Sequence, residues 1–253
     1  MVATVLLLAG WPQILHAAPP AEQDWVATFD AAFDGPLDTA IWAPESGSFD
    51  AFESPRDPAH VAVENGLARL VVGHSDRGGW QWISGEISSR SFRQTYGYFE
   101  ARLRYAGATG LNNGFRLATD APLAEGGAVI DVDQGHYPSE IVTALRRSGE
   151  VLAQKTMVPS ADLSREFHLY GLAWLPNNHG STTLRWYFDG RLIRTLDCAQ
   201  CTQPVRIVLG AAVTSNAKVA GPATPALDGK SMDIAAVRVY RLKEPESVAN
   251  ATP

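Results

Sequence analysis

Apolar and polar residues alternate with a period of two along much of this chain, which is the pattern of β-strands whose two faces differ. Turn-forming pairs separate the alternating segments, at Asn65-Gly66, Gly78-Gly79, Asp189-Gly190 and Asp228-Gly229 and after Pro176. The clearest strand-like segments, rich in aromatic and β-branched residues, are 97–105, 184–188, 205–209 and 234–240. The pattern therefore predicts an antiparallel all-β sandwich or barrel.

Long stretches with helical periodicity are missing, which excludes a doubly wound α/β enzyme. Residues 160–167 are expected to form one short helical turn. No linker interrupts residues 25–242, so we expect a single domain there, followed by a disordered tail over residues 243–253.

The N-terminal residues 1–18 combine an apolar run with a small-residue exit, Leu15-His16-Ala17-Ala18, and are interpreted as a signal peptide. No basic residue precedes the run, so a misassigned start or an uncleaved anchor remains an alternative. Cleavage would give a secreted or periplasmic protein without a membrane contact. The net charge of -6 and the lack of a Lys/Arg cluster exclude a nucleic-acid partner. Oligomeric state is left open.

The only two cysteines, Cys198 and Cys201, are spaced Cys-x-x-Cys. In an oxidising compartment a local disulfide is expected. A redox dithiol or half of a zinc site is the alternative, but no βαβ pattern and no second ligand pair accompany the motif.

Four stretches, taken together and in order, resemble glycoside hydrolase family 16, the β-glucanase, agarase and carrageenase family. They lie at 29–42, 84–102, 167–190 and 232–240 and include Ser84-Gly85-Glu86-Ile87 and Trp186-Tyr187-Phe188-Asp189-Gly190. The resemblance implies a concanavalin-like β-jelly-roll sandwich of two antiparallel sheets with a concave glycan cleft. It also implies a polysaccharide as the partner.

The catalytic strand of that family reads Glu-x-Asp-x-Glu, or Glu-x-Asp-x-x-Glu where a bulge is present, with the first Glu as nucleophile and the last as general acid/base. The matching strand here begins at Val129 and places Asp131, Asp133 and Gln134 at the following positions. Without a bulge, residues 129, 131 and 133 share a face; with one, the third member is Gln134. The Gly-His-Tyr-Pro sequence that follows favours the bulged register.

Either register puts Val129 at the nucleophile position, and valine can neither attack an anomeric carbon nor stabilise positive charge. Gln134 can donate a hydrogen bond but cannot transfer a proton. The resemblance therefore predicts an impaired catalyst. Asp133 and Glu125, which lies in the loop before the catalytic strand, are the carboxylates considered as substitutes.

Further candidates concern sugar binding. Arg116 stands where the family commonly has Trp, and could bind an acidic glycan or form a salt bridge with Asp131 or Asp133. Each other candidate has a structural alternative, as a core residue, a solvated turn or a support of the site. Glu86 and Glu100 are interpreted as structural. The remaining binding candidates are Trp80, Trp82, Asn112, Asn113, His136, Tyr137 and Trp174.

No metal or cofactor is expected from the residues. Family resemblance alone allows a structural calcium ion, with Asp30, Gly66 or Asp233 as oxygen donors, but no dense Asp/Asn loop supports it. Three functions remain open: a non-catalytic glycan-binding protein, a hydrolase or transglycosidase with relocated carboxylates, and an interaction module of an export or secretion assembly.

Overall fold

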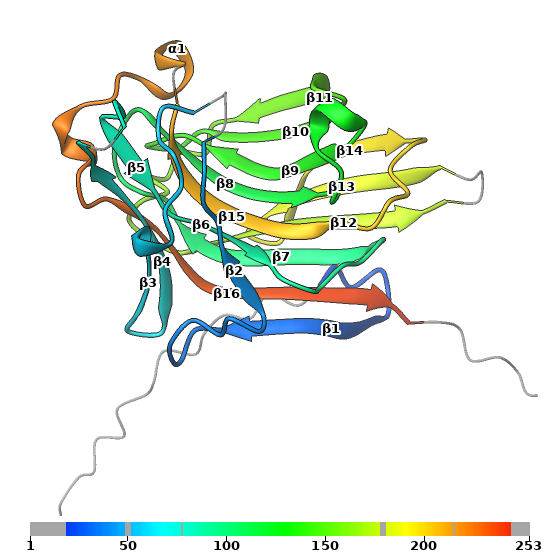
Figure 1. Cartoon of the computed structure of the whole chain (residues 1–253). Coiled ribbons are helices and arrows are strands. Elements are labelled where there is room, and N and C mark those ends of the chain that lie inside the picture. Colours follow the sequence, from blue (N-terminus) through cyan, green and yellow to red (C-terminus); the bar gives the residue numbers. More distant parts are fainter. Residues whose placement is uncertain (1–18, 49–51, 77, 178–180, 215, 244–253) are drawn as a thin grey trace, which may run out of the picture.

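The computed structural model describes residues 19–48, 52–76, 78–177, 181–214 and 216–243 (Figure 1). The predicted signal peptide at 1–18 and the tail from 244 onwards lie outside these residues. The first strand starts at Trp25 and the last ends at Leu242, and these two residues pair with each other. No helix among the described residues has the length and apolarity needed to cross a bilayer.

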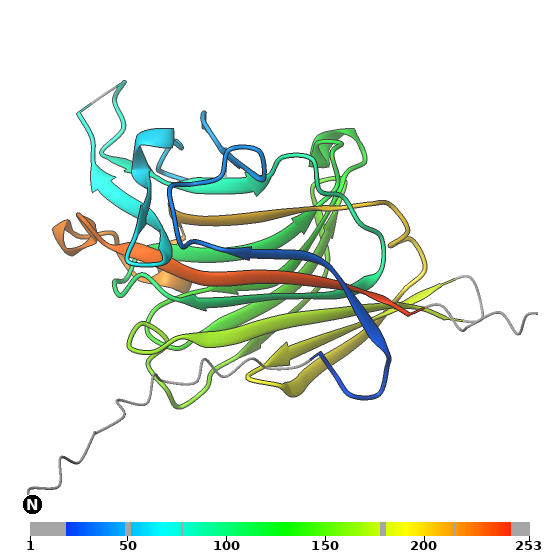
Figure 2. The same ribbon diagram turned by 90° about the horizontal axis from the view of Figure 1, so that it is seen from below.

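Two antiparallel sheets form the fold, which confirms the predicted all-β sandwich. The nine-stranded sheet runs in the order β14 (Arg191–Cys198), β13 (Thr182–Phe188), β12 (His168–Pro176), β7 (Gly97–Arg104), β16 (Ser231–Leu242), β4 (Leu67–His74) and β3 (Val61–Glu64), with β1 (Trp25–Ala32) beside β16 and β5 (Trp82–Ser84) beside β4. Figure 2 shows β1 and β16 running side by side.

The seven-stranded sheet carries the segment that resembles the catalytic strand. Its order is β11 (Glu150–Met157), β10 (Ile141–Arg147), β9 (Ala128–Gly135), β8 (Leu111–Ala118), β15 (Arg206–Val213), β6 (Glu86–Ser89) and β2 (Trp42–Pro44). The helices of the described residues are short: α1 (Ala217–Ala220), η1 (Pro58–His60), η2 (Leu123–Glu125) and η3 (Pro225–Leu227).

Alternation along the strands explains the core between the sheets. On β8, Leu111, Phe115 and Leu117 are fully buried in the core cluster, whereas Asn112 and Arg116 face the other side. Burying each large apolar side chain stabilises the fold by roughly 1.5–3 kcal/mol. The same alternation therefore leaves a second face of the seven-stranded sheet free for polar residues.

The predicted turns follow from backbone geometry. Asn65-Gly66 joins β3 to β4, and Asp189-Gly190 joins β13 to β14; all four residues have positive φ, from 47° to 76°. Asn, Asp and Gly tolerate that conformation, and it suits the twist of a two-residue hairpin.

One predicted element is wrong and one predicted bond is confirmed. Residues 160–167 form turns without a helix, because Asp162 accepts hydrogen bonds from the backbone N–H and hydroxyl of Ser164, a local arrangement that competes with a helix. Cys198 and Cys201 form the expected disulfide at the end of β14.

Candidate functional site

Strand β9 contains the bulge that the favoured register requires. Phe115 of β8 pairs with Asp133, but the next residue, Arg116, pairs with Asp131, so Val132 is the extra residue. Arg116 faces away from the core, and Asp131 opposite it does the same. Val129, Asp131 and Gln134 therefore share the open face of the seven-stranded sheet, which we call the floor.

Asp131 is held by an arginine that the sequence reasoning did not consider. Arg146 of β10 lies opposite Val129 in the sheet. Its Nε donates to Asp131 Oδ2 at 2.8 Å and its Nη2 donates to Gln134 Oε1 at 2.6 Å. Burial raises the pKa of Asp131, and the Arg146 charge opposes this rise. The surviving acidic position of the motif is thus bound in an ion pair.

Asp133 does not reach the floor. Its side chain points into the interior, where the Tyr105 hydroxyl donates to Oδ2 at 2.6 Å, while Oδ1 has no partner. Burial raises the pKa of Asp133 well above its ordinary value. The proposed use of Asp133 as a substitute carboxylate is therefore wrong, because the bulge turns this residue toward the core.

Arg116 pairs with Glu86 of β6, so of the two alternatives considered from sequence the salt bridge to Asp131 or Asp133 is wrong. Glu86 also binds Arg56, with Nε at 3.1 Å from Oε1. Gly210 of β15 makes this arrangement possible, since a Cβ there would lie 2.7 Å from Glu86 Oε2. Glu86 is structural, as expected, but it belongs to the floor.

The ion pairs continue toward the edge of the sheet. Arg206 of β15 donates to Glu45 Oε1 at 2.9 Å, and the Ser88 hydroxyl donates to the same oxygen. In the described part of this sheet, arginine–carboxylate pairs thus extend across the floor, from Glu45 just after β2 to Arg146 on β10.

The three tryptophan candidates separate. Trp80 precedes β5 and is 36% exposed, whereas Trp82 is 3% exposed and packs in the core. Trp174 is also a core residue, and its Nε1 donates to the Cys201 carbonyl at 3.1 Å. Sugar stacking by Trp82 or Trp174 is excluded by this burial. Trp80 lies outside the strand and is the one of the three that remains exposed.

Asn112 and Asn113 both lie within β8. Asn113 faces the core, where Oδ1 accepts from the Ala106 N–H at 2.8 Å. Asn112 is on the floor side, is 4% exposed, and its Oδ1 has no hydrogen-bond partner. Only Asn112 thus remains available to a ligand hydroxyl.

His136 and Tyr137 follow β9. His136 is buried, with Nδ1 3.5 Å from Glu140 Oε2. Burial lowers the pKa of His136, and the Glu140 carboxylate opposes this shift. A Cβ on Gly135 would run into Tyr105 of the interior, so the next residue, His136, points toward the floor side. Tyr137 is half-buried.

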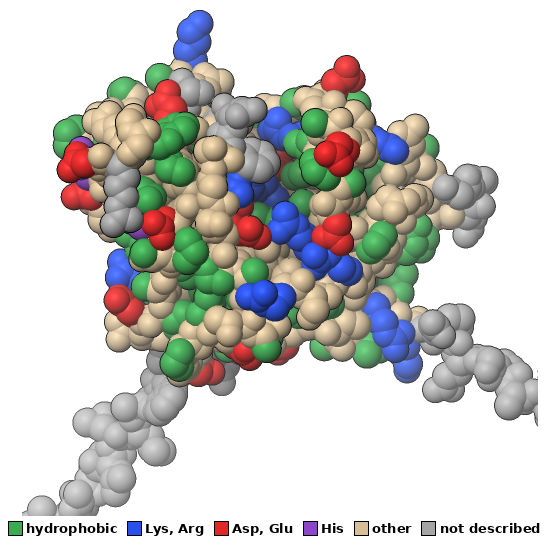
Figure 3. Space-filling view, viewed as in Figure 1, with side chains coloured by type: hydrophobic (Ala, Val, Ile, Leu, Met, Phe, Trp, Pro, Cys, Tyr) green, Lys and Arg blue, Asp and Glu red, His purple; other side chains and the backbone are tan. Residues whose placement is uncertain are grey.

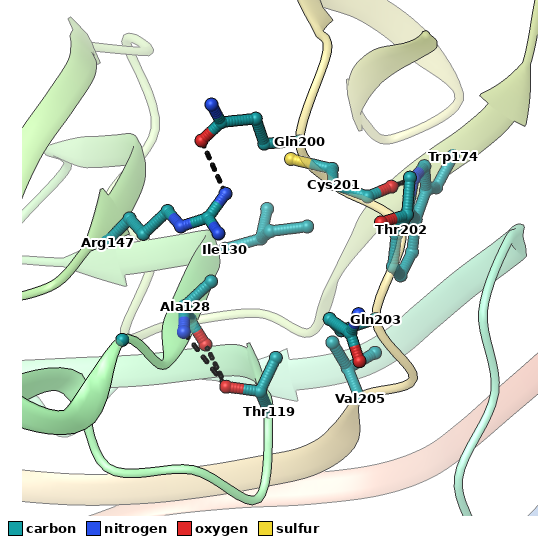
Figure 4. A pocket seen from close by; sticks show the side chains of 11 residues that line it. Thr119, Ala128, Ile130, Arg147, Trp174, Gln200, Cys201, Thr202, Gln203 and Val205 are labelled. Carbon is teal, nitrogen blue, oxygen red and sulfur yellow. Dashed lines mark hydrogen bonds between the residues drawn. The ribbon is translucent and has the colours of Figure 1, made fainter. Parts of the chain in front are cut away.

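Glu125 is exposed at the end of η2, in the turn between β8 and β9. Beside this turn the structure has a small pocket with the core residues Ile130, Trp174 and Val205 at its base (Figure 4). Arg147 crosses its rim and donates to Gln200. Because Ile130 faces the core, this pocket is separate from the floor.

Two of the residues considered for calcium, Asp233 and Asp30, are engaged by arginines. Asp233 is bound by Arg69 and by Arg104, the latter at 2.7 Å, and it also accepts from a serine hydroxyl. Asp30 is paired with Arg238. The described residues hold no group of three or more His, Cys, Asp or Glu side chains that could bind a metal.

Sequence reasoning missed Arg146, Arg56 and the floor position of Glu86. Arg146 could have been found by pairing β9 with β10 across their short connection, which sets Arg146 opposite Val129. No comparable local signal exists for Glu86 and Arg116. Their strands, β6 and β8, become neighbours only because β15, from a later part of the chain, pairs with both.

Comparisons with known proteins agree with this architecture. The model of a family described as glycosyl hydrolases family 16 matches residues 50–223. The chain is 34% identical over 119 residues to a beta-glucanase of Fibrobacter succinogenes, covering 42% of this chain and 31% of that protein. It is 25% identical over 228 residues to the endo-1,3-1,4-beta-glycanase ExsH of Rhizobium meliloti, covering 79% and 46%.

The chain thus spans less than half the length of these two curated relatives. Among solved structures, the endo-beta-1,3-glucanase of Pyrococcus furiosus superposes with a TM-score of 0.76 at 17% identity, covering 90% of this chain and all of that one. This likeness concerns the fold.

Proposed function

Because the chain belongs to glycosyl hydrolase family 16, we propose that it is a non-catalytic member that binds an extracellular or cell-envelope polysaccharide along the floor. The family acts on polysaccharides, and the fold that supports such binding is retained. What distinguishes this chain is the chemistry of β9.

The observation that carries the proposal is the shared face of Val129, Asp131 and Gln134. A retaining mechanism needs two carboxyl groups about 5–5.5 Å apart, one to attack the sugar and one to protonate the leaving oxygen. Of the three positions only Asp131 ionises, and Arg146 binds its carboxylate. Neither covalent attack nor proton transfer has a group to perform it there.

The other buried carboxylate of the floor does not replace the lost pair. Glu86 on β6 is separated from β9 by β15 and β8. Three strand spacings correspond to about 14 Å between the strand axes. Glu86 is also engaged by two arginines, which keeps its carboxylate from acting as a nucleophile. These features favour binding over hydrolysis.

We further propose that the protein works outside the cytoplasm, in the periplasm or beyond it. The disulfide between Cys198 and Cys201 supports an oxidising compartment. The apolar leader at 1–18 is consistent with export, although it lies outside the described residues.

The test is to combine a binding assay with an activity assay on one polysaccharide panel. Affinity electrophoresis measures retardation of the purified protein by each soluble polymer, and a reducing-end assay with mass spectrometry measures cleavage. We expect retardation by at least one polymer without new reducing ends. Release of oligosaccharides that disappears in Asp131→Asn would overturn the proposal, because the floor would then be catalytic.

A further inference from the structure

On the floor, the carboxylates are more deeply buried than the arginines that pair with them. The Asp131 side chain is 1% exposed and that of Glu86 is 6% exposed, whereas their partners Arg146 and Arg116 are 26% and 15% exposed. The carboxylates therefore lie beneath the guanidinium groups. A molecule that approaches the floor meets positive charge first.

Figure 3 shows the result on the surface. Basic side chains gather near the middle of this face, in and beside a hollow, with acidic side chains next to them. Among the described residues, the arginines Arg56, Arg116, Arg146 and Arg206 form ion pairs there with the carboxylates of Glu45, Glu86 and Asp131. Glu140 lies beyond this group, beside His136.

Strand β8 carries two buried polar atoms on the floor side that have no hydrogen-bond partner among the described residues. Arg116 Nε is a donor without an acceptor, and Asn112 Oδ1 is an acceptor without a donor. Both belong to β8, four residues apart on the same face. Buried polar groups are normally hydrogen-bonded, so these two atoms point to a ligand that supplies an acceptor and a hydroxyl.

The floor offers little exposed aromatic surface for stacking a neutral sugar ring: Phe52 has its ring centroid 6.0 Å from the Arg116 guanidinium carbon, but it is only 8% exposed. Along the described strands from β2 to β10, the side chains on this face are small, aliphatic, amide or charged, and none is aromatic. Aromatic side chains are a main source of contact area in binding sites. Recognition must therefore depend on hydrogen bonds and charge.

We propose that the ligand of the floor is a polysaccharide that carries carboxylate groups, such as a polymer of uronic acids, and that Arg116 binds one of them. This rests on the proposed function and specifies its ligand. A planar guanidinium binds a carboxylate through two parallel N–H groups. A ligand carboxylate would take the place of Glu86 on the Arg116 guanidinium and reach its unpartnered Nε, while Glu86 keeps its ion pair with Arg56.

The experiment measures affinity of the full chain for polygalacturonate and alginate (carboxylated), dextran sulfate (sulfated) and laminarin and lichenan (neutral) at several salt concentrations. We expect binding to the carboxylated polymers, with an affinity that falls as salt rises. Arg116→Gln should weaken that binding about tenfold or more, because it removes a charge-assisted hydrogen bond.

A second variant, expected to tighten binding where Arg116→Gln weakens it, distinguishes a binding role of Arg116 from a structural one. Glu86→Gln removes a competing carboxylate, and we expect it to tighten binding of the carboxylated polymers about three- to tenfold. If that variant does not fold, Glu45→Gln, which releases the more exposed Arg206, should act in the same direction. Arg191→Gln, on exposed β14 of the other sheet, is the matched control and should change nothing.

Binding confined to laminarin or lichenan would overturn this inference and leave the proposed function intact. Binding confined to dextran sulfate, or equal weakening by Arg116→Gln and Glu86→Gln, would also overturn it. If no polymer of the panel binds, the proposed function fails as well.

Discussion

The pair between Arg146 and Asp131 permits a sharp test of how the floor is built. Arg146→Gln removes the charge that faces an almost fully buried carboxylate and keeps a side chain able to hydrogen-bond. Breaking a buried ion pair from one side typically costs 3–5 kcal/mol. Arg116 also acts on Asp131 electrostatically, and Arg146 is partly exposed. We therefore expect a loss of about 3 kcal/mol at neutral pH.

The loss should depend on pH with a defined sign. Burial raises the pKa of Asp131 in the folded protein, and removal of Arg146 raises this pKa further. The unfolded chain ionises in the same way in both proteins, so the variant loses stability relative to the wild type as pH rises through the raised folded-state pKa of Asp131. As pH falls, this carboxyl gains its proton in both folded proteins, so the difference should be smaller at pH 4 than at pH 8.

Urea denaturation at pH 4 and pH 8 measures both quantities. Asp131→Asn provides the comparison: its amide still accepts from Arg146, so we expect a loss of only about 1 kcal/mol. Equal losses for the two variants, or a loss in Arg146→Gln that is the same at both pH values, would refute the reasoning. It would mean that Asp131 is not an uncompensated buried charge when Arg146 is gone.

Two further predictions concern other buried groups. Burial raises the pKa of Glu100 to about 7, although Arg238 Nη1 lies 3.8 Å from its Oε1 and opposes the rise; Glu100→Gln should therefore stabilise the fold by about 3 kcal/mol at pH 8 and have little effect at pH 4, as measured in urea. If the variant and the wild type differed in free energy of unfolding by the same amount at pH 4 and pH 8, this prediction would be contradicted. In Gly135→Ala the new Cβ would lie 1.9 Å from the buried Tyr105 hydroxyl, so thermal unfolding should show a loss of about 2 kcal/mol or more, and an unchanged melting temperature would contradict this.

The fold was predictable because its information is local. Strands such as β7 and β16 can be predicted from the alternation of apolar and polar residues. The hairpins at Asn65-Gly66 and Asp189-Gly190 can be predicted from residues that accept positive φ. The short turn expected at 160–167 failed for an equally local reason. The Asp162 side chain accepts hydrogen bonds from the backbone N–H and the hydroxyl of Ser164, which favours a turn over a helix.

The site was predictable only in part, because faces and partners depend on distant strands. The bulge at Val132 is visible once β8 is set against β9, and it decides that Gln134 faces the floor while Asp133 faces the core. Trp82 looked equivalent to Trp80 in sequence, but only the strand residue entered the core.

The partner of Arg116 required sheet order that sequence alone does not supply. Glu86 reaches it because β15, whose residues are far along the chain from both, lies between β6 and β8. Gly210 at the crossing leaves the space that the carboxylate occupies. A pairwise guess from motif spacing therefore chose the nearer aspartates.

The position of Arg146 makes the change on β9 hard to reverse. An acid introduced by Val129→Glu would stand directly opposite its guanidinium, and one introduced by Gln134→Glu would inherit the contact that Gln134 now makes. Arg146 already binds Asp131, so its single positive charge would be shared among three carboxylates. On the proposed non-catalytic function, we therefore expect that an acid pair introduced at 129 and 134 would also need a replacement at 146 before the two could act on a sugar.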